Sequence, residues 1–268
     1  MFGLQYCFKN SGNEGFKVNK EAIANELNWD LYAGNYSAWI AKQLTSFRRD
    51  AWLSELCRAL GEEKNKKVLD VGTGPGFFPI ILSEAGYQIT GIDSSEQMIT
   101  VAANNLSSYG IHAKLLQMNA EDLQFSDGSF DAVIARNITY ALSEPEKAYS
   151  EWLRVLKKGG KLLIYDHNWF YFLCNEADKL VVMDFLEKFH LKTGKAHETY
   201  EIEVEQFYEH IISRPMTHRK RPEWDVDFFS LQGIKNVSVD FNSTKKMFTE
   251  YELYENSPTP MFVLEIIK

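Results

Sequence analysis

The chain has 268 residues, of which 45% are hydrophobic and 25% are charged, so it carries enough apolar side chains for the core of one elaborated globular domain. Its formal net charge of −8 argues against a general nucleic-acid-binding protein, because neutralising phosphates takes a basic surface. No apolar run reaches membrane-spanning length, the first residues lack a signal-peptide core, and the three cysteines show no metal-ligand spacing, so we expect a cytoplasmic protein without a membrane partner.

The first part of the chain is rich in aromatic side chains and ends in a helical pattern. Residues 37–60 carry apolar side chains near helical spacing, and Gly61 can end the last turn. This stretch therefore predicts one or two helices. The aromatic residues before and within it can either pack on the edge of a sheet or contact a ligand.

A strand, a glycine turn and a helix follow. Residues 68–71 form a short apolar run that predicts a buried strand, and residues 77–85 look helical. Between them stand Gly72, Gly74 and Gly76. Glycines let the backbone adopt positive φ and let a ligand approach the main chain, while the start of a helix offers unpaired N–H groups. The turn is therefore predicted to hold a ligand.

The spacing of this turn separates two classes of ligand. A dinucleotide-binding turn has its third glycine five positions after the first, where this chain has Phe77. Asp70 precedes the first glycine, and its carboxylate would repel a phosphate but could accept a hydrogen bond from an ammonium group. Both features disfavour a dehydrogenase and predict a ligand with a cation near the turn.

A second strand is predicted at residues 88–92, and it stops at Asp93. An acidic side chain at this distance from the glycine turn can accept hydrogen bonds from both ribose hydroxyls of a nucleoside. Ser94 and Gln97 form a capping-box pattern for the next helix. Met98 lies on the apolar side of that helix and can either pack in the core or contact a ligand.

Three more strands and the helix before the last of them continue the alternation of strands and helices. Strands are predicted at residues 113–118, 130–135 and 162–165. The helix before the last of them is predicted to have Ser143 as its cap and Pro145 in its first turn, and to end at residues 157–160. Residues 166–170 then emerge at the carboxyl edge of the sheet, where open α/β sheets bind their ligands.

This order of motifs resembles the class I S-adenosylmethionine-dependent methyltransferases, whose first motif ends a strand with an acidic residue and continues as a G-x-G-x-G loop. The resemblance covers residues 67–167. It implies an α/β fold with a doubly wound, Rossmann-like sheet of seven mostly parallel strands, the last of them antiparallel. It also implies S-adenosyl-L-methionine as cofactor, S-adenosyl-L-homocysteine as product, and no metal.

The resemblance further implies which residues contact the cofactor. Glu121 and Asp122 are expected near the exocyclic amine of adenine, although both could also lie in a solvated turn. The segment that begins at Arg136 is expected beside the methionine end. The full set implied by the resemblance is Tyr36, Asp70, Gly72, Thr73, Gly74, Gly76, Asp93, Ser94, Met98, Ala120, Glu121, Asp122, Arg136 and Asn137.

The pattern changes after the fifth strand, which indicates an insertion that could form a substrate cap. Helices are predicted around residues 180–189 and 204–212, the second ended by Pro215, and residues 200–205 could instead form a short strand. A helix at 225–231 and strands at 235–241 and 261–267 follow. The expected segments are an N-terminal helical lid (1–60), the cofactor-binding core (61–168), a cap (169–223), and a C-terminal helix and strand pair that complete the sheet (224–268).

Methyl transfer from a sulfonium ion is an in-line displacement, so the protein mainly has to align donor and acceptor and exclude water. A hydroxyl or thiol acceptor would also need a general base. His167 is the expected base, although a structural histidine fits the same position, and Arg136 is the second residue expected at the reacting atoms.

The methyl acceptor is predicted to be a small molecule whose identity the sequence leaves open. An RNA methyltransferase is the main alternative, because Arg214 and residues 218–221 form a compact basic run. The same run could instead hold a carboxylate or phosphate of a small substrate, or lie solvated in a loop. A non-catalytic nucleoside-binding protein is a further alternative.

Overall fold

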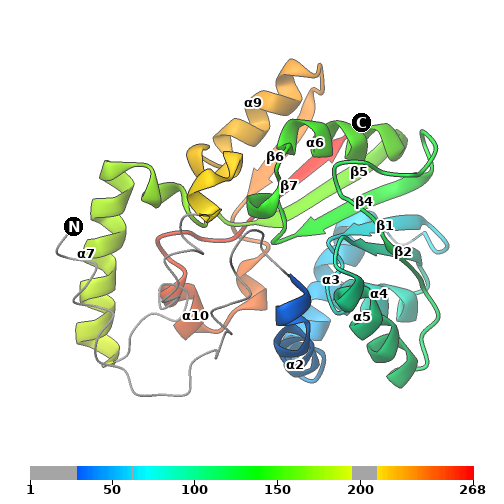
Figure 1. Ribbon diagram of the computed structural model, residues 1–268, viewed down its shortest axis with the longest axis horizontal. Helices are drawn as coiled ribbons and strands as arrows, with labels where there is room; N and C mark the ends of the chain where they lie inside the picture. The colour runs from blue at the N-terminus through cyan, green and yellow to red at the C-terminus, as the bar shows by residue number, and fades with distance from the viewer. Residues whose placement is uncertain (1–28, 62, 195–209) are drawn as a thin grey trace.

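The computed structural model describes residues 29–61, 63–194 and 210–268. They form one seven-stranded sheet with helices on both faces (Figure 1). Its strands, in spatial order, are β3 (Lys114–Gln117), β2 (Gln88–Asp93), β1 (Lys67–Val71), β4 (Phe130–Arg136), β5 (Leu156–Asp166), β7 (Phe262–Ile267) and β6 (Asn236–Asp240). Strands β1 to β5 pair in parallel, and β7 is antiparallel to both β5 and β6. The predicted fold class is confirmed.

The two faces of the sheet are covered by different helices, which follows from the alternation of side chains along each strand. Val68 of β1 packs in one core with α2 (Ala33–Leu44), α3 (Phe47–Leu60), α4 (Phe77–Glu84) and α5 (Glu96–Ser108). Leu69 packs in the other core with α6 (Pro145–Val155) and α9 (Glu223–Leu231). Asp70 therefore points to the same side as Val68, toward α3 and α4.

The predicted helical stretch at residues 37–60 is two helices, α2 and α3, and Gly61 ends the second as predicted. A short 3-10 helix, η1 (Trp29–Tyr32), precedes them. Figure 1 shows η1 at the carboxyl edge of the central strands. No helix among the described residues is long and apolar enough to cross a bilayer.

Three predicted helix boundaries were wrong. The cap of α5 is Ser95 rather than Ser94, because the Asp93 carboxylate accepts the Ser95 N–H and holds Ser95 in an extended conformation. At the start of α6 the flanking residue is Glu144 rather than Ser143, and its side chain forms no capping bond. Residues 157–160 do not end α6 but begin β5, where Lys157 binds the Asp131 carboxylate of β4 at 2.6 Å.

The insertion is described in part. Helix α7 (Glu176–Thr193) contains the helix predicted at residues 180–189 and stands beyond the carboxyl edge of the sheet (Figure 1). It packs against α10 (Glu250–Glu255), which the sequence did not predict, through Phe185 and Tyr254 with ring centroids 5.5 Å apart. The possible strand at 200–205, and most of the helix predicted at 204–212, lie outside the described residues. Pro215 begins η5 (Pro215–His218).

Candidate functional site

The turn between β1 and α4 holds three glycines with positive φ, at 68°, 50° and 90° for Gly72, Gly74 and Gly76. A side chain on Gly72 would come within 2.5 Å of the Ile138 side chain, and one on Gly76 within 2.7 Å of the Leu106 side chain. A Cβ at either position would displace these neighbours, and the positive φ disfavours any residue other than glycine there. At Gly74, no atom of the described residues lies within 4 Å of where a Cβ would be. Gly74 is the glycine that leaves room for a ligand.

Asp93 ends β2 beside this turn and is half-buried. One carboxylate oxygen accepts a hydrogen bond from the Gly74 N–H at 2.9 Å, and the other accepts from the Ser95 N–H at 3.0 Å. Burial raises the pKa of Asp93, and these backbone bonds oppose the rise. Each carboxylate oxygen has two lone pairs, so both can accept one more hydrogen bond from a ligand.

Asp70 and Arg136 bring opposite charges to the same place. Asp70 is 2% exposed and accepts a hydrogen bond from the Thr73 hydroxyl at 2.7 Å. Burial raises the pKa of Asp70 to about 7, while Thr73 and the positive charge of Arg136 lower it. Arg136 ends the neighbouring strand on the same face, since Asp70 pairs with Ile134 two residues before it. Burial lowers the pKa of Arg136 to about 10.

The N-terminal segment crosses this edge of the sheet. Asp30 of η1 accepts hydrogen bonds from the Ser95 hydroxyl and, at 3.3 Å, from the Gln97 N–H at the start of α5. The Trp29 ring lies 6.1 Å from that of Tyr36 and 6.3 Å from that of Tyr140, which follows β4. The segment thus bridges α5 and the loop after β4. Sequence reasoning missed Asp30, because one 3-10 turn carries no periodic signal.

Glu121 stabilises the start of α6. Its carboxylate accepts the N–H groups of Ser143 at 2.6 Å and Glu144 at 3.0 Å, which is the capping role predicted for the Ser143 side chain. Ala120 is buried beside it, and Asp122 is exposed. Of the two carboxylates predicted near adenine, Asp122 is therefore the one whose oxygens have no hydrogen-bond partner among the described residues.

Three further predicted residues, Ser94, Met98 and Asn137, differ in how deeply they are buried. Ser94 is exposed, and Met98 is buried in α5. Asn137, directly after β4, has a φ of 54°, and its side-chain oxygen is buried without a hydrogen-bond partner in the described part of the chain. A left-handed backbone and an unsatisfied amide oxygen are features that cluster at binding sites.

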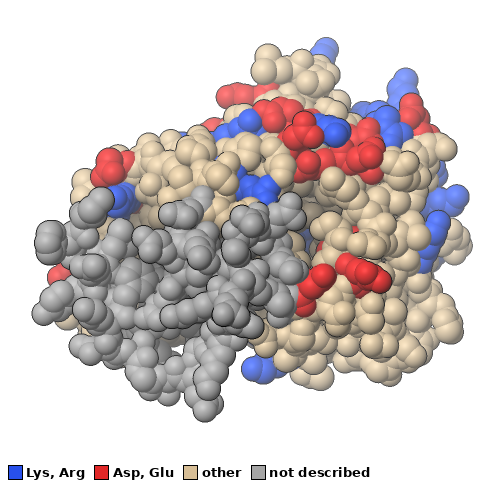
Figure 2. Space-filling view, viewed as in Figure 1, with Lys and Arg blue, Asp and Glu red and all other residues tan. Residues whose placement is uncertain are grey.

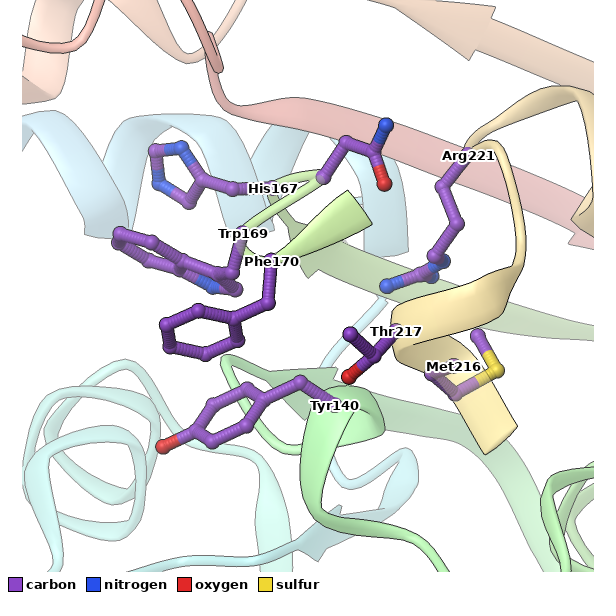
Figure 3. Close-up of a pocket in the computed structure, with 8 residues that line it drawn as sticks. Tyr140, His167, Trp169, Phe170, Met216, Thr217 and Arg221 are labelled. Carbon is purple, nitrogen blue, oxygen red and sulfur yellow. The ribbon is translucent and has the colours of Figure 1, made fainter. Parts of the chain in front are cut away.

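A small pocket lies beyond the ends of β4 and β5 (Figure 3). Tyr140, Phe170 and Trp169 line one side, with ring centroids 5.6 Å apart for the first two and 6.5 Å for the last two. Thr217 and Arg221 lie on the other side. The lining residues are Tyr140, His167, Asn168, Trp169, Phe170, Met216, Thr217 and Arg221.

His167, the predicted base, is 3% exposed and its ring lies 4.1 Å from that of Trp169. Its Nδ1 is 2.6 Å from the carbonyl oxygen of Thr259. A carbonyl only accepts, so Nδ1 carries the proton and Nε2 keeps a lone pair. Burial lowers the pKa of His167 to about 4, so the ring is neutral at pH 7.

This buried histidine predicts an acid-sensitive fold. The pKa of His167 falls from its ordinary value of 6.5 to about 4 in the folded state, so the unfolded chain binds the proton more tightly. The contribution of the neutral ring to the stability of the fold is complete above pH 6.5 and is lost as the pH falls from 6.5 to 4. Urea unfolding at pH 7.5 and pH 5 should therefore show wild type losing stability relative to His167→Asn. Parallel losses in the two proteins would contradict this.

Arg221 forms a buried network at the back of this pocket. It is 5% exposed, and its guanidinium binds both oxygens of Asp225 at 2.9 Å and lies 3.2 Å from Asp166. It also donates to the Thr139 hydroxyl and, at 3.2 Å, to the Tyr149 hydroxyl. Four hydrogen bonds and the ion pair with Asp166 therefore hold this guanidinium inside the protein.

The basic run at residues 214–221 is consequently not an open anion site. Arg219 pairs with Glu146, Lys220 lies 3.1 Å from Glu223, and Arg214 binds the His210 ring at 2.9 Å. The expectation that Arg221 could hold an anionic group of a substrate was wrong, because two buried carboxylates already neutralise it. Figure 2 shows acidic and basic side chains intermingled on the face in view, without a broad basic patch on its described part.

Comparison with known proteins identifies relatives of this chain. Residues 69–164 match the family model described as "Methyltransferase domain". The ubiquinone/menaquinone biosynthesis C-methyltransferase of Haemophilus ducreyi is 31% identical over 178 residues, covering 60% of this chain and 67% of that protein. The phosphatidylethanolamine N-methyltransferase of Cereibacter sphaeroides is 37% identical over 103 residues, covering 38% of this chain and 50% of the relative.

A solved structure also shares the fold. Haemonchus contortus phosphoethanolamine N-methyltransferase 2, in complex with S-adenosyl-L-methionine, superposes with a TM-score of 0.58 at 16% identity, covering 96% of this chain and 61% of that one. The chain spans about half the length of several curated relatives that it matches.

Proposed function

Because this chain belongs to the class I S-adenosylmethionine-dependent methyltransferases, we propose that it transfers a methyl group from S-adenosylmethionine to a small-molecule acceptor. The observation that carries this proposal is the Asp93 carboxylate, which the Gly74 and Ser95 N–H groups hold beside the open side of Gly74. A second carboxylate, Asp70, lies close enough to Asp93 for their charges to interact. Two carboxylates at one turn suit a nucleoside that carries a cation, and they oppose a pyrophosphate.

The residues at the turn fit this cofactor. Asp93 has acceptors left for the two ribose hydroxyls, and Gly74 leaves the space beside them open. We assign Met98, Ala120 and Asp122 to the adenine side, and Asn137 and Tyr36 to the side of the reacting group. Bound S-adenosylmethionine supplies an electrophilic methyl group on a sulfonium ion. The protein's own contribution is to orient the acceptor and exclude water.

We propose the small pocket after β4 and β5 as the acceptor site. Its rings, Tyr140, Phe170 and Trp169, offer flat apolar surface, and its one arginine is neutralised internally, so the pocket suits an acceptor without a negative charge at this point. The relatives named above are a C-methyltransferase of ubiquinone/menaquinone biosynthesis and a phosphatidylethanolamine N-methyltransferase, and methyl transfer to carbon or to nitrogen is open for this chain. His167 stays the candidate base, since its ring is neutral at pH 7.

We also propose roles for the flanking segments. Residues 1–60 act as a lid and residues 169–223 as a cap over the core at 61–168, which residues 224–268 complete. The contacts of Trp29 and Asp30 across the edge of the sheet support the lid. A cytoplasmic location is proposed as well, and the free thiols of Cys57 and Cys174 suit a reducing compartment.

Binding tests the proposal directly. Mass spectrometry of the purified protein should detect retained adenosine nucleosides, and calorimetry should show binding of S-adenosylhomocysteine. NAD⁺ serves as the control, because it shares the adenosine but adds a pyrophosphate that Asp70 and Asp93 disfavour. Equal binding of both ligands, or of NAD⁺ alone, would reject the methyltransferase assignment in favour of a dinucleotide site.

Replacing Asp93 with alanine should weaken S-adenosylhomocysteine binding by well over tenfold. Hydrogen bonds to a charged group contribute about 1.5–3 kcal/mol each, and the variant loses two of them to ribose. Asp93→Asn, which keeps one acceptor oxygen, should lose less. Calorimetry measures the affinities, and circular dichroism checks that both variants are folded. Normal affinity in a folded Asp93→Ala protein would remove Asp93 from the site.

A further inference from the structure

Aromatic rings form one wall of the small pocket after β4 and β5. The rings of His167, Trp169, Phe170 and Tyr140 follow one another along this wall (Figure 3). The distances between successive ring centroids are 4.1, 6.5 and 5.6 Å. The face of an aromatic ring carries partial negative charge and attracts a cation within about 6 Å of the ring centroid. The wall therefore favours a ligand group that is positively charged or becomes so.

The buried network at the back of the pocket has an excess of negative charge. Asp166 and Asp225 are both fully buried, and the guanidinium that pairs with them is that of Arg221, which lines the pocket. The hydrogen bonds printed on these two carboxylates all come from N–H and O–H donors, which favours their ionised form. Two negative charges against one positive charge leave one negative charge in excess, and burial limits its screening by salt.

The polar atoms that line the pocket suit N–H groups of a ligand. The Nδ1–H of His167 is bound to a carbonyl oxygen, so its Nε2 can only accept. The Thr217 hydroxyl donates to the carbonyl oxygen of Ile211 at 2.6 Å and keeps its lone pairs for a ligand. The Asn168 amide can accept or donate, and the Arg221 guanidinium is bound to its own carboxylates. A carboxylate or phosphate would meet these acceptors and the excess negative charge.

The size of the pocket limits what can enter it. Its volume is about 10 Å³, which is room for one group of the size of a water molecule or an ammonium. A six-membered ring such as that of a quinone needs several times this volume, whereas a nitrogen at the end of a chain does not. The pocket therefore fits the end of a chain.

We propose that the methyl acceptor is an alkylamine whose nitrogen occupies this pocket, against the rings of Trp169, Phe170 and Tyr140. This inference rests on the proposed function and narrows it to one class of acceptor. In this account the Nε2 atom of His167 accepts an N–H of the amine and thereby orients the nitrogen lone pair. The remainder of the chain extends out of the pocket.

Methyl transfer moves a positive charge onto this nitrogen. The amine reacts as its free base, after the ammonium form has given one proton to water. Its lone pair forms the bond to the methyl carbon, and the carbon–sulfur bond breaks with its electron pair left on sulfur. The positive charge that leaves sulfur therefore appears on nitrogen. Ring faces and excess negative charge stabilise that nitrogen more in the transition state than in the neutral amine, which is what accelerates a reaction.

Three probes of equal length test the preference of the pocket for a cation. They are n-propylammonium, n-propanol and propionate, and at pH 7.5 the first is protonated because the pKa of an alkylammonium is about 10. Ligand-observed NMR titrations use wild type saturated with S-adenosylhomocysteine, at constant ionic strength. We expect propylammonium to bind about tenfold more tightly than propanol, as for a desolvated cation–π contact, and propionate to bind most weakly.

Two matched variants test whether the rings cause this preference. Phe170→Leu keeps an apolar side chain but removes a ring from the wall, so it should lower the affinity for propylammonium by about threefold to tenfold and leave that for propanol unchanged. Phe172 is the control, because it is also buried, in η3 (Tyr171–Leu173), but is not among the lining residues. Phe172→Leu should keep the wild-type ratio of the two affinities. Thermal melts report the stability of both variants.

Transfer of an isotopically labelled methyl group to a panel of alkylamines and the corresponding alcohols and phenols identifies the methylated atom by mass spectrometry. N-methylated products are expected. Products methylated only on oxygen or carbon, equal affinities of wild type for propylammonium and propanol, or a preference that Phe170→Leu retains in full would each overturn the inference. If Phe170→Leu does not fold, or no panel member reacts, the wild-type ratio decides. Failure of wild type to bind S-adenosylhomocysteine would instead reject the proposed function.

Discussion

Replacing Arg221 with methionine is expected to lower the free energy of unfolding by about 3–5 kcal/mol, because it leaves buried carboxylates without their counter-charge. Asp166 and Asp225 are both fully buried, and each lies within 3.2 Å of the Arg221 guanidinium. Methionine fills a similar volume, so the loss comes from uncompensated charge and not from a cavity. Urea unfolding monitored by circular dichroism measures the change.

Arg219 provides the matched control two residues away. It carries the same charge and length, but it pairs with the exposed Glu146 and lies over the Trp224 ring at 4.0 Å. Exposed ion pairs and cation–π contacts contribute little to stability, so Arg219→Met should lower the free energy of unfolding by no more than about 1–2 kcal/mol. Equal losses in the two variants would mean that the buried network is not what stabilises this region.

The network also positions the proposed acceptor site. One oxygen of Asp166 accepts the indole N–H of Trp169 at 3.0 Å and the N–H of His167 at 2.8 Å, while the other binds Arg221 and Thr139. The carboxylate therefore fixes the first residues after β5 and the turn after β4 together. A partly destabilised Arg221→Met protein is expected to lose the fixed orientation of Trp169, which its fluorescence would report.

The sequence predicted the sheet and the glycine turn because their signals are local. Apolar strands, positive-φ glycines and the carboxylate of Asp93 lie within short stretches, and each element's role follows from its own residues. The boundaries were less predictable. Ser94 and Ser95 are equally good caps by type, and the choice depends on which N–H the Asp93 carboxylate binds.

Charged residues were the hardest to interpret, because their partners are distant in the sequence. Arg221 looked like one member of an exposed basic run, yet it is buried against Asp166, 55 residues earlier, and Asp225. The i, i+4 spacing of Arg221 and Asp225 was the one local sign of this pairing. Glu121 was predicted near adenine, and its second role, binding the start of α6 through one carboxylate oxygen, had no local signal. Arg136 was expected at the reacting end, and the aromatic rings that surround its guanidinium come from three separate segments that no local pattern connects.

Replacing Gly74 with leucine is expected to abolish measurable binding of S-adenosylhomocysteine while leaving the fold intact. A Cβ at Gly74 meets no described atom within 4 Å, so the side chain would extend into the space proposed for the ligand. The left-handed φ of 50° adds a backbone cost of roughly 1–2 kcal/mol for any residue with a side chain. The variant would therefore also be less stable, and this loss of stability must be separated from the loss of ligand binding.

Gly110 separates them, because it has the same two properties away from the turn. Its φ is 66°, and a Cβ there also meets no atom of the described residues within 4 Å. It follows α5 at the opposite end from Asp93, so Gly110→Leu should carry the same backbone cost without reaching the ligand. Calorimetry with S-adenosylhomocysteine and thermal melts should show similar losses of stability in the two variants, with binding lost only in Gly74→Leu. Retained binding in a folded Gly74→Leu protein would place the cofactor elsewhere, since a ligand that contacts the main chain at this turn cannot share that space with a leucine side chain.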